Sequence, residues 1–138
     1  MPRTTMNKIS IVDLRETPSQ DYLDGFIEIY GKTFTDLRER EDPAEWPDRM
    51  WKDAPTPQPR THLLVALSND SGCVVGGLVF EHYRESHCAL LTYLVVEPAW
   101  RRKGIARNLV ERALSTLIRE ERVFGGQLRG VFCETENP

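Results

Sequence analysis

Polar and apolar residues alternate across residues 8–16, and this period of two predicts a β-strand. A helix is predicted to follow. Thr17 is its expected N-cap, Pro18 its first residue and Gln20 the side chain that completes a capping box. Apolar side chains then recur three and four positions apart, at Tyr22, Leu23, Phe26, Ile27, Tyr30 and Phe34.

Residues 35–60 are irregular and rich in proline, with one short helix predicted near 44–52. Trp46 and Trp51 lie in this segment. We expect both to pack on the core, although tryptophans in a long loop can also line a substrate site. The segment is acidic, which favours either a cationic substrate or a solvated face: Asp36, Glu39, Glu41, Asp42, Glu45 and Asp48.

Three strands are predicted next, at residues 62–67, 73–83 and 88–96. Their short connections indicate an antiparallel meander. The third is apolar on both faces, so it is predicted to be central and covered on both sides.

A long helix is predicted from Gly104 to the Gly125-Gly126 pair, and a last strand at 128–134. A strand–helix–strand unit within one sheet makes the third and last strands of this half parallel neighbours. The predicted fold class is therefore α/β (α+β), with a mixed, mostly antiparallel central sheet flanked by helices.

Composition narrows the function. The 138 residues suit one domain spanning 1–138, and the net charge of −3 argues against a general nucleic-acid binder. The three cysteines form no CxxC pair, so neither a zinc site nor any other metal site is expected. No signal peptide or membrane span is apparent, so a cytoplasmic location is the expectation.

The run VVEPAWRRKGIARNLV carries the clearest chemical signal. Arg101, Arg102 and Lys103 stand directly before the start of the long helix, where unpaired N–H groups and the positive end of the helix dipole already lie. Extra cations there cost stability unless an anion binds, and Gly104 lets a ligand approach the backbone. A solvated basic turn is the alternative. The phosphate motifs GxxxxGK[ST] and GxGxxG are both missing from the sequence.

The stretch Arg101-Arg102-Lys103-Gly104-Ile105-Ala106 resembles the R/Q-x-x-G-x-G/A signature of the GNAT superfamily of N-acetyltransferases. The preceding LTYLVVEPAW is similar to that family's fourth strand and its turn, and the order of elements matches over about residues 8–138. The resemblance implies acetyl-CoA as cosubstrate. Its pyrophosphate would lie on the backbone of Arg102, Lys103, Gly104, Ile105 and Ala106, with Arg101 and Arg107 nearby. Its pantetheine arm would pair with Leu94, Val95 and Val96, and Asn137 would contact the same cofactor.

The resemblance gives less help with catalysis. A general base must remove the proton of the amine, and the fourth strand lacks the glutamate that some family members have. Glu134 after the last strand is the first candidate for the base and Glu81 the second, while Tyr93 is either buried or faces the site. His82 and His87 flank the YRES turn and are expected to be exposed.

Family members normally continue with a helix and two more strands, so we expect this domain to be C-terminally incomplete relative to the family. The exposed edge of the last strand would then favour a homodimer or completion by a C-terminal segment. The expected function is acetyl transfer to a primary amine of a small molecule or peptide. A non-catalytic acyl-CoA-binding sensor or regulatory module is the alternative. Neither nucleic acid nor a membrane is an expected partner.

Overall fold

One sheet of five strands forms the middle of the computed structural model, which describes residues 8–38, 40–52 and 58–133. The strands are β1 (Ile9–Asp13), β2 (Arg60–Ser68), β3 (Val74–Tyr83), β4 (Cys88–Val96) and β5 (Gly130–Cys133). The helices are α1 (Gln20–Thr33), α2 (Trp46–Trp51) and α3 (Ile105–Val123), with short 3-10 turns η2 (Pro43–Glu45) and η3 (Pro98–Trp100). The predicted mixed sheet with flanking helices is confirmed.

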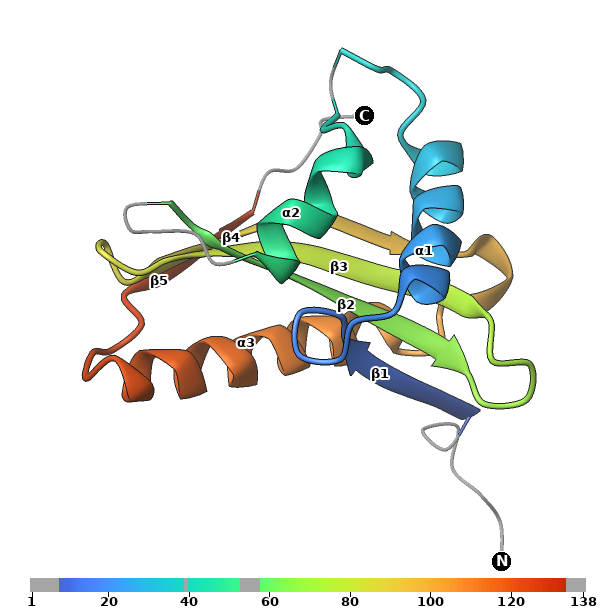
Figure 1. Ribbon diagram of the computed structural model, residues 1–138. Coiled ribbons are helices and arrows are strands. Elements are labelled where there is room, and N and C mark those ends of the chain that lie inside the picture. The colour runs from blue at the N-terminus through green and yellow to red at the C-terminus, as the bar shows by residue number, and fades with distance from the viewer. Residues whose placement is uncertain (1–7, 39, 53–57, 134–138) are drawn as a thin grey trace, which may run out of the picture.

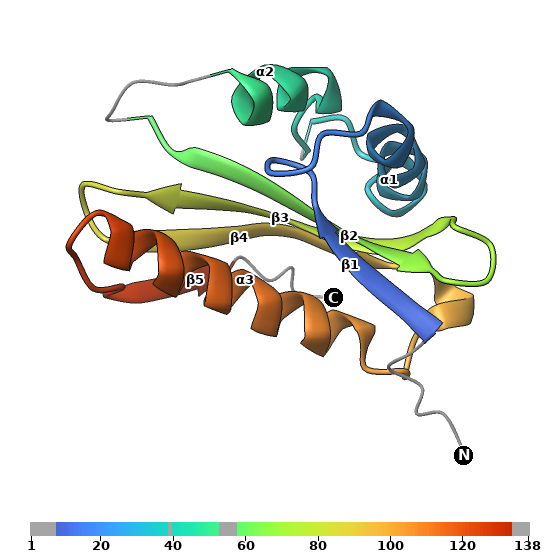
Figure 2. The same ribbon diagram turned by 60° about the horizontal axis from the view of Figure 1, so that its bottom comes forward.

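The helices divide between the two faces of the sheet. α1 and α2 cover one face, and α3 runs along the other (Figures 1 and 2). The strands lie in the order β1-β2-β3-β4-β5; the first four are antiparallel, and β4 pairs with β5 in parallel, as the sequence predicts. None of the helices in the described residues has the length and apolar character that crossing a bilayer requires.

The strand predicted at residues 88–96 lies inside the sheet, as expected, with β3 and β5 on its two sides, but β3 holds the middle place. Every residue of β3 between its two ends is buried, whereas most of β4 is only partly buried. β4 is less buried because only part of it has a β5 partner among the described residues. β5 pairs only with Cys88–Leu91, so the second half of β4 has β3 alone as a partner among the described residues.

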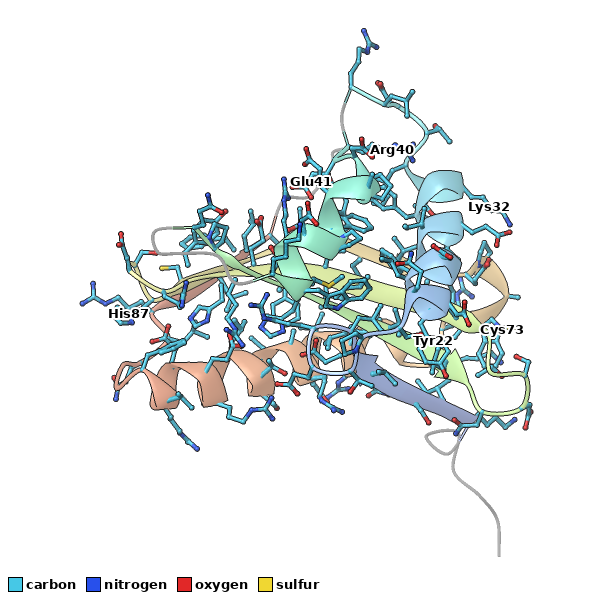
Figure 3. All side chains as sticks on the ribbon, viewed as in Figure 1. Tyr22, Lys32, Arg40, Glu41, Cys73 and His87 are labelled. Atoms are coloured by element: carbon cyan, nitrogen blue, oxygen red, sulfur yellow. The ribbon has the colours of Figure 1, made fainter. Side chains whose placement is uncertain are left out.

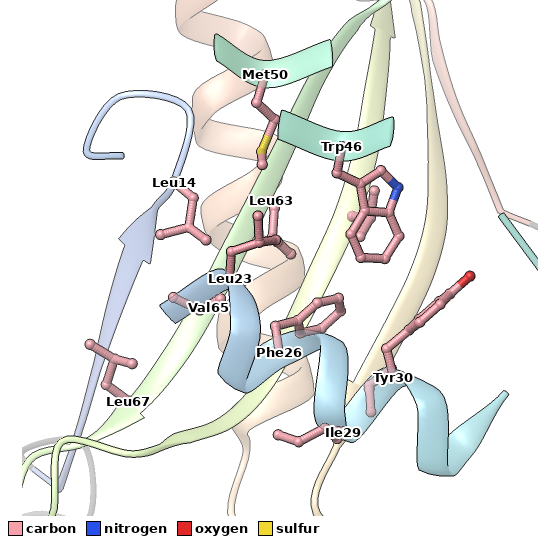
Figure 4. Packing of buried hydrophobic residues seen from close by; sticks show 12 residues of the cluster. Leu14, Leu23, Phe26, Ile29, Tyr30, Trp46, Met50, Leu63, Val65 and Leu67 are labelled. Carbon is pink, nitrogen blue, oxygen red and sulfur yellow. The ribbon is translucent and has the colours of Figure 1, made fainter. Parts of the chain in front are cut away.

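The core between the sheet and α1 is aromatic (Figure 4). Trp46 of α2 is 1% exposed, and its ring centroid lies 5.7 Å from that of Phe26 and 4.9 Å from that of Tyr30. Trp51 packs at the margin of this cluster and donates its indole N–H to the Leu14 carbonyl at 2.7 Å. Both tryptophans thus pack on the core, as predicted.

α1 begins later than the sequence predicts. Ser19 is the N-cap, and its hydroxyl accepts the N–H of Tyr22 at 3.2 Å. Thr17 instead donates its N–H to the Asp13 carbonyl and closes the turn after β1. Gln20 lies inside the helix and donates its side-chain amide to Asp24, so the predicted capping box does not form. Ser19 caps the helix because its extended backbone, with φ −152°, directs the hydroxyl toward the first turn.

The prediction of an exposed His82 is also wrong, since this side chain is 0% exposed. It lies on the α3 face of the sheet, between two glutamates of that helix. His87 is only partly exposed. A position next to a turn looks solvent-exposed in the sequence, but the C-terminal half of α3 covers this end of the hairpin.

Gly77 of β3 lies directly against the Phe26 ring of α1. A Cβ at this position would lie 2.5 Å from ring carbons of Phe26 and 2.9 Å from the Leu64 carbonyl oxygen. We therefore expect Gly77→Ala to lower the free energy of unfolding by about 1–3 kcal/mol, because Phe26 must move within a packed core. Urea denaturation measures the change.

Gly130→Ala is the matched control for this substitution. Gly130 is also a strand glycine, but the nearest heavy atom to its Cβ would be 3.5 Å away, which is ordinary contact. Its free energy of unfolding should change by no more than about 0.5 kcal/mol. Equal losses in the two variants would contradict the close contact between Gly77 and Phe26.

Candidate active site

The basic turn joins the end of β4 to the start of α3. After η3, residues 101–104 bring the chain to Gly104, which is the N-cap in a left-handed conformation with φ 81°. No side chain caps the helix, and the first helical hydrogen bond runs from the N–H of Asn108 to the Gly104 carbonyl. The N–H groups of this first turn are therefore free of side-chain caps, as an anion site requires.

Arg102 adds backbone strain to this turn. Its φ of 64° places a residue with a side chain in the left-handed region, which glycine would adopt at no cost. Such strain persists only where the surrounding structure imposes it, and it concentrates at functional sites. Two left-handed residues, Arg102 and Gly104, thus set the course of one four-residue turn.

The cations around the turn remain largely in solvent. Arg101, Arg102 and Lys103 are all exposed. Arg101 donates its Nε to the Val96 carbonyl at 3.2 Å, which ties the turn to the end of β4, and the Lys103 ammonium lies 5.8 Å from the ring centroid of Trp100. Arg107 pairs with Glu111 one turn further along α3. The predicted residues 101–107 therefore surround one helix end.

β4 carries a bulge where it separates from β5. Tyr93 is opposite Val79, but the next residue of β3, Phe80, is opposite Leu91, so Thr92 is the extra residue. The bulge changes the direction of the side chains. Leu91 packs on the α3 face, while Tyr93, two positions later, packs on the α1 face.

The pairing of β4 with β5 ends at the same point, with Leu91 opposite Cys133. In the described part of the chain, the backbone of Thr92–Val96 thus has no strand on its β5 side, and the buried Thr92 hydroxyl has no hydrogen-bond partner. Leu94, Val95 and Val96 all lie in this half-paired segment. Such an edge offers backbone N–H and C=O groups to an extended ligand.

Glu81 lies in β3 on the side covered by α2. Its side chain is buried, at 8% exposure. Burial raises the pKa of Glu81, and the nearby charge of Glu41 raises it further, while Arg49 and a hydrogen bond with Tyr83 act in the opposite direction. A buried carboxylate with a raised pKa is suited to accept a proton near neutral pH. Its cross-strand partner on β4 is Leu90, next to the point where β4 and β5 separate.

Glu41 is held beside this carboxylate by several contacts, near the start of α2 (Figure 3). Its N–H donates to the Tyr93 hydroxyl at 2.8 Å, and its carbonyl accepts from the Tyr30 hydroxyl at 2.8 Å. Its carboxylate accepts from the Trp46 indole at 3.1 Å and pairs with Arg49 at 3.2 Å. The segment between α1 and α2 is thereby fixed onto β4.

Tyr93 therefore connects the aromatic core to the segment that holds Glu41. Its ring packs against those of Tyr30, at 5.0 Å, and Phe34, at 5.1 Å. Burial raises the pKa of Tyr30, and the hydrogen bond with Tyr93 raises it further. Sequence reasoning included Glu41 only as one of six acidic residues and did not single out Arg49 or Tyr30, because their partners lie far away along the chain.

Two of the predicted residues, Glu134 and Asn137, lie outside the described residues. Among those that are described, no group of three or more histidine, cysteine, aspartate or glutamate side chains is arranged to hold a metal ion. The end of β4, with Leu94–Val96, leads through η3 to the helix start at Arg101–Arg107. Glu81 and Tyr93 instead face the side of α1 and α2.

Comparison with solved structures finds the same fold in acetyltransferases. One is an aminoglycoside acetyltransferase from an uncultured soil metagenomic sample, in complex with sisomicin. It is 18% identical, with a TM-score of 0.71 over 96% of this chain and 80% of that one. Another is a ribosomal-protein-alanine N-acetyltransferase from Brucella melitensis biovar Abortus 2308. It is 17% identical, with a TM-score of 0.63 over 94% of this chain and 81% of that one.

The sequence comparisons are consistent with these structures. No curated protein matches the chain in sequence. The sequence profile of the acetyltransferase (GNAT) family matches residues 23–136, which is most of the chain and includes the helix end, the bulged strand and Glu81. The chain therefore belongs to the GNAT family of acetyltransferases.

Proposed function

We propose that this protein transfers the acetyl group of acetyl-CoA to a primary amine of a small molecule or peptide. The observation that carries the proposal is the turn before α3, where a left-handed Gly104 leaves the helix start without a side-chain cap and exposed cations surround it. The pyrophosphate of acetyl-CoA would accept hydrogen bonds from Arg102–Ala106 and offset the repulsion between those cations and the helix dipole.

The pantetheine arm has a matching place in this proposal. It would pair with the backbone of Leu94, Val95 and Val96, along the side of β4 that lacks a β5 partner in the described residues. The thioester would then lie near the bulge at Thr92, where a backbone N–H can stabilise the oxyanion of the tetrahedral intermediate. Asn137 remains a proposed contact of the same cofactor.

The acceptor would approach from the side of α1 and α2. Glu81, Glu41 and Glu45 lie on that side, with Arg49 paired to the last two, and this surplus of carboxylates favours a cationic amine. Two acetyltransferases of the same fold are named for amine-bearing acceptors, an aminoglycoside and the alanine of a ribosomal protein. A small-molecule or peptide amine is consistent with both.

The proposed reaction is a direct attack. The neutral amine nitrogen forms a bond to the thioester carbonyl carbon, and the carbon–sulfur bond then breaks. Glu81, directly or through one water, takes the proton that the amine loses, and the departing thiolate takes up a proton from a nearby donor. Tyr93 is the candidate donor on β4, and Glu134 remains the rival candidate for the base.

The cofactor site is tested at Gly104. Acetyl-CoA at about 100 times its Kd should raise the free energy of unfolding of the wild type by about 2.7 kcal/mol. We expect Gly104→Glu to abolish this increase, because the new carboxylate would repel the pyrophosphate. Thermal melts with and without acetyl-CoA measure the effect.

Gly125→Glu is the matched control at the other end of α3. Gly104 and Gly125 have φ values of 81° and 75°, and neither has a heavy atom within 4 Å of its would-be Cβ. Both substitutions therefore impose similar backbone strain, but only the one at Gly104 should remove the response to acetyl-CoA. A full response in Gly104→Glu would rule out the proposed site.

The base is tested by Glu81→Gln, which keeps the shape of the side chain and removes its proton affinity. We expect turnover to fall about 100-fold or more, with little change in the Kd of acetyl-CoA. In the wild type, turnover should decrease as pH falls through the raised pKa of Glu81, because only the ionised carboxylate accepts a proton. Steady-state rates across pH measure both effects.

Two further variants separate the alternatives for the base. Glu85→Gln alters an exposed carboxylate in the adjacent hairpin and should leave turnover unchanged. Glu134→Gln tests the rival base directly. Normal turnover in Glu81→Gln together with a large loss in Glu134→Gln would assign the role to Glu134.

Turnover itself is tested with a panel of aminoglycosides, polyamines and N-terminal peptides. We expect at least one amine to stimulate release of free CoA thiol, measured with a thiol reagent, together with an acetylated product detected by mass spectrometry. Tight binding of acetyl-CoA without transfer to any amine would instead support a non-catalytic acyl-CoA-binding module.

A further inference from the structure

A buried network of charged side chains joins the C-terminal half of α3 to the sheet, on the face opposite Glu81. Its inner part centres on His62 of β2, which is 0% exposed. The Nδ1 of this ring lies 3.0 Å from a carboxylate oxygen of Asp13, and its Nε2 lies 2.8 Å from Glu120. Arg60 contacts the same oxygen of Glu120 at 2.8 Å. Residues from β1, β2 and α3 therefore meet at one point.

The outer part centres on His82 of β3, which is also 0% exposed. Its Nδ1 lies 2.9 Å from Glu120 and its Nε2 lies 2.5 Å from Glu121. Glu121 in turn contacts the Nδ1 of His87 at 2.7 Å. His87 is 34% exposed and lies at the end of the sheet far from Cys73 (Figure 3), so the network reaches the surface there.

Hydrogen-bond geometry defines the charge state of the two buried rings. A neutral imidazole has one N–H donor, and its other nitrogen carries a lone pair that a carboxylate repels. His62 and His82 each place both nitrogens against carboxylate oxygens, so beside ionised carboxylates each ring donates to both neighbours as an imidazolium. The three cations His62, His82 and Arg60 then balance the three anions, which are Asp13, Glu120 and Glu121.

We propose that this network attaches the C-terminal half of α3 to β1, β2 and β3 in a pH-dependent way. The attachment is stable while both buried imidazoles are protonated and weakens when they lose a proton. Loss of one proton from each ring would leave three buried carboxylates with Arg60 and the partly exposed His87 beside them, and one N–H fewer from each buried ring. Buried charge that loses its partner is strongly destabilising. Ring contacts lie beside the network. His62 stacks on Phe80, and His82 lies beside the Phe124 ring, which Arg84 covers from another side.

The direction in which pH changes the stability follows from the shifted pKa values of the histidines and glutamates. Burial lowers the pKa of His62 and His82, but their hydrogen bonds to carboxylates outweigh it and raise the pKa of both rings. Their stabilising contribution is complete below the unfolded pKa of about 6.5 and is lost as pH rises through the folded pKa. Burial likewise opposes ionisation of Glu120 and Glu121, yet the histidines lower the pKa of both. That contribution is lost in acid, below about pH 4.3.

The first test is a nitrogen-15 NMR titration of the wild-type protein, whose three histidines are all in this region. His87→Gln removes one set of signals and thereby assigns it. We expect His62 and His82 to carry protons on both ring nitrogens at pH 7 and to lose them only above neutrality. A neutral tautomer of either ring at pH 6.5 would overturn the proposal.

The second test measures how stability depends on pH, by urea denaturation between pH 6 and pH 9. Above pH 7, the logarithm of the unfolding equilibrium constant should rise with a slope approaching two protons per molecule from these rings. We expect the slope to be lower by about one or more in His82→Gln and nearly unchanged in His87→Gln. Equal slopes in all three proteins would refute the network as a pH device. If His82→Gln does not fold, the NMR titration still decides.

Discussion

The crossover from β4 through α3 to β5 is the constraint on which the candidate site depends. A parallel neighbour is reached only by a connection that returns along the face of the sheet, and here that connection is a 19-residue helix. The start of the helix must therefore lie beside the end of β4. Because β5 pairs with only the first four residues of its partner, the second half of β4 is left with one described neighbour. This one connection therefore brings the helix end that begins at Gly104 next to the half-paired part of β4.

Two consecutive residues of β3 lie in different electrostatic environments, one on each face of the sheet. Glu81 points to the side of α2, where burial and Glu41 make its ionisation harder. His82 points to the side of α3, where two carboxylates favour the charged form of its ring. A sheet alternates the direction of its side chains, so adjacent residues can hold a proton acceptor on one face and a stable cation on the other. One layer of backbone thereby separates the proposed base from the residues that attach α3.

Much of the fold and the basic turn before α3 can be predicted from sequence because their signals are local. The spacing of apolar residues indicates the helices, and the basic run before Gly104 is contiguous. The errors concern contacts between distant residues. His82 meets Glu120, 38 positions later, and Glu41 meets Tyr93, 52 positions later, and neither partner is visible in a local pattern. The sequence predicts Thr17 as the N-cap because Pro18 and Gln20 fit the positions that follow it, and only the backbone path selects Ser19. The middle place of β3 follows from the order of the strands in the sheet, which periodicity does not report.

The contact between Gly77 and Phe26 also restricts how this fold can change over evolutionary time. Any larger residue at position 77 meets the Phe26 ring and the Leu64 carbonyl, so it becomes tolerable only after the ring has been replaced by a smaller side chain. A smaller side chain at position 26, in turn, leaves a void in an aromatic core until position 77 grows. A larger residue at position 77 and a smaller one at position 26 can therefore replace the present pair only through a destabilised single variant. A single substitution at either position therefore costs packing that only a second substitution at the other can restore.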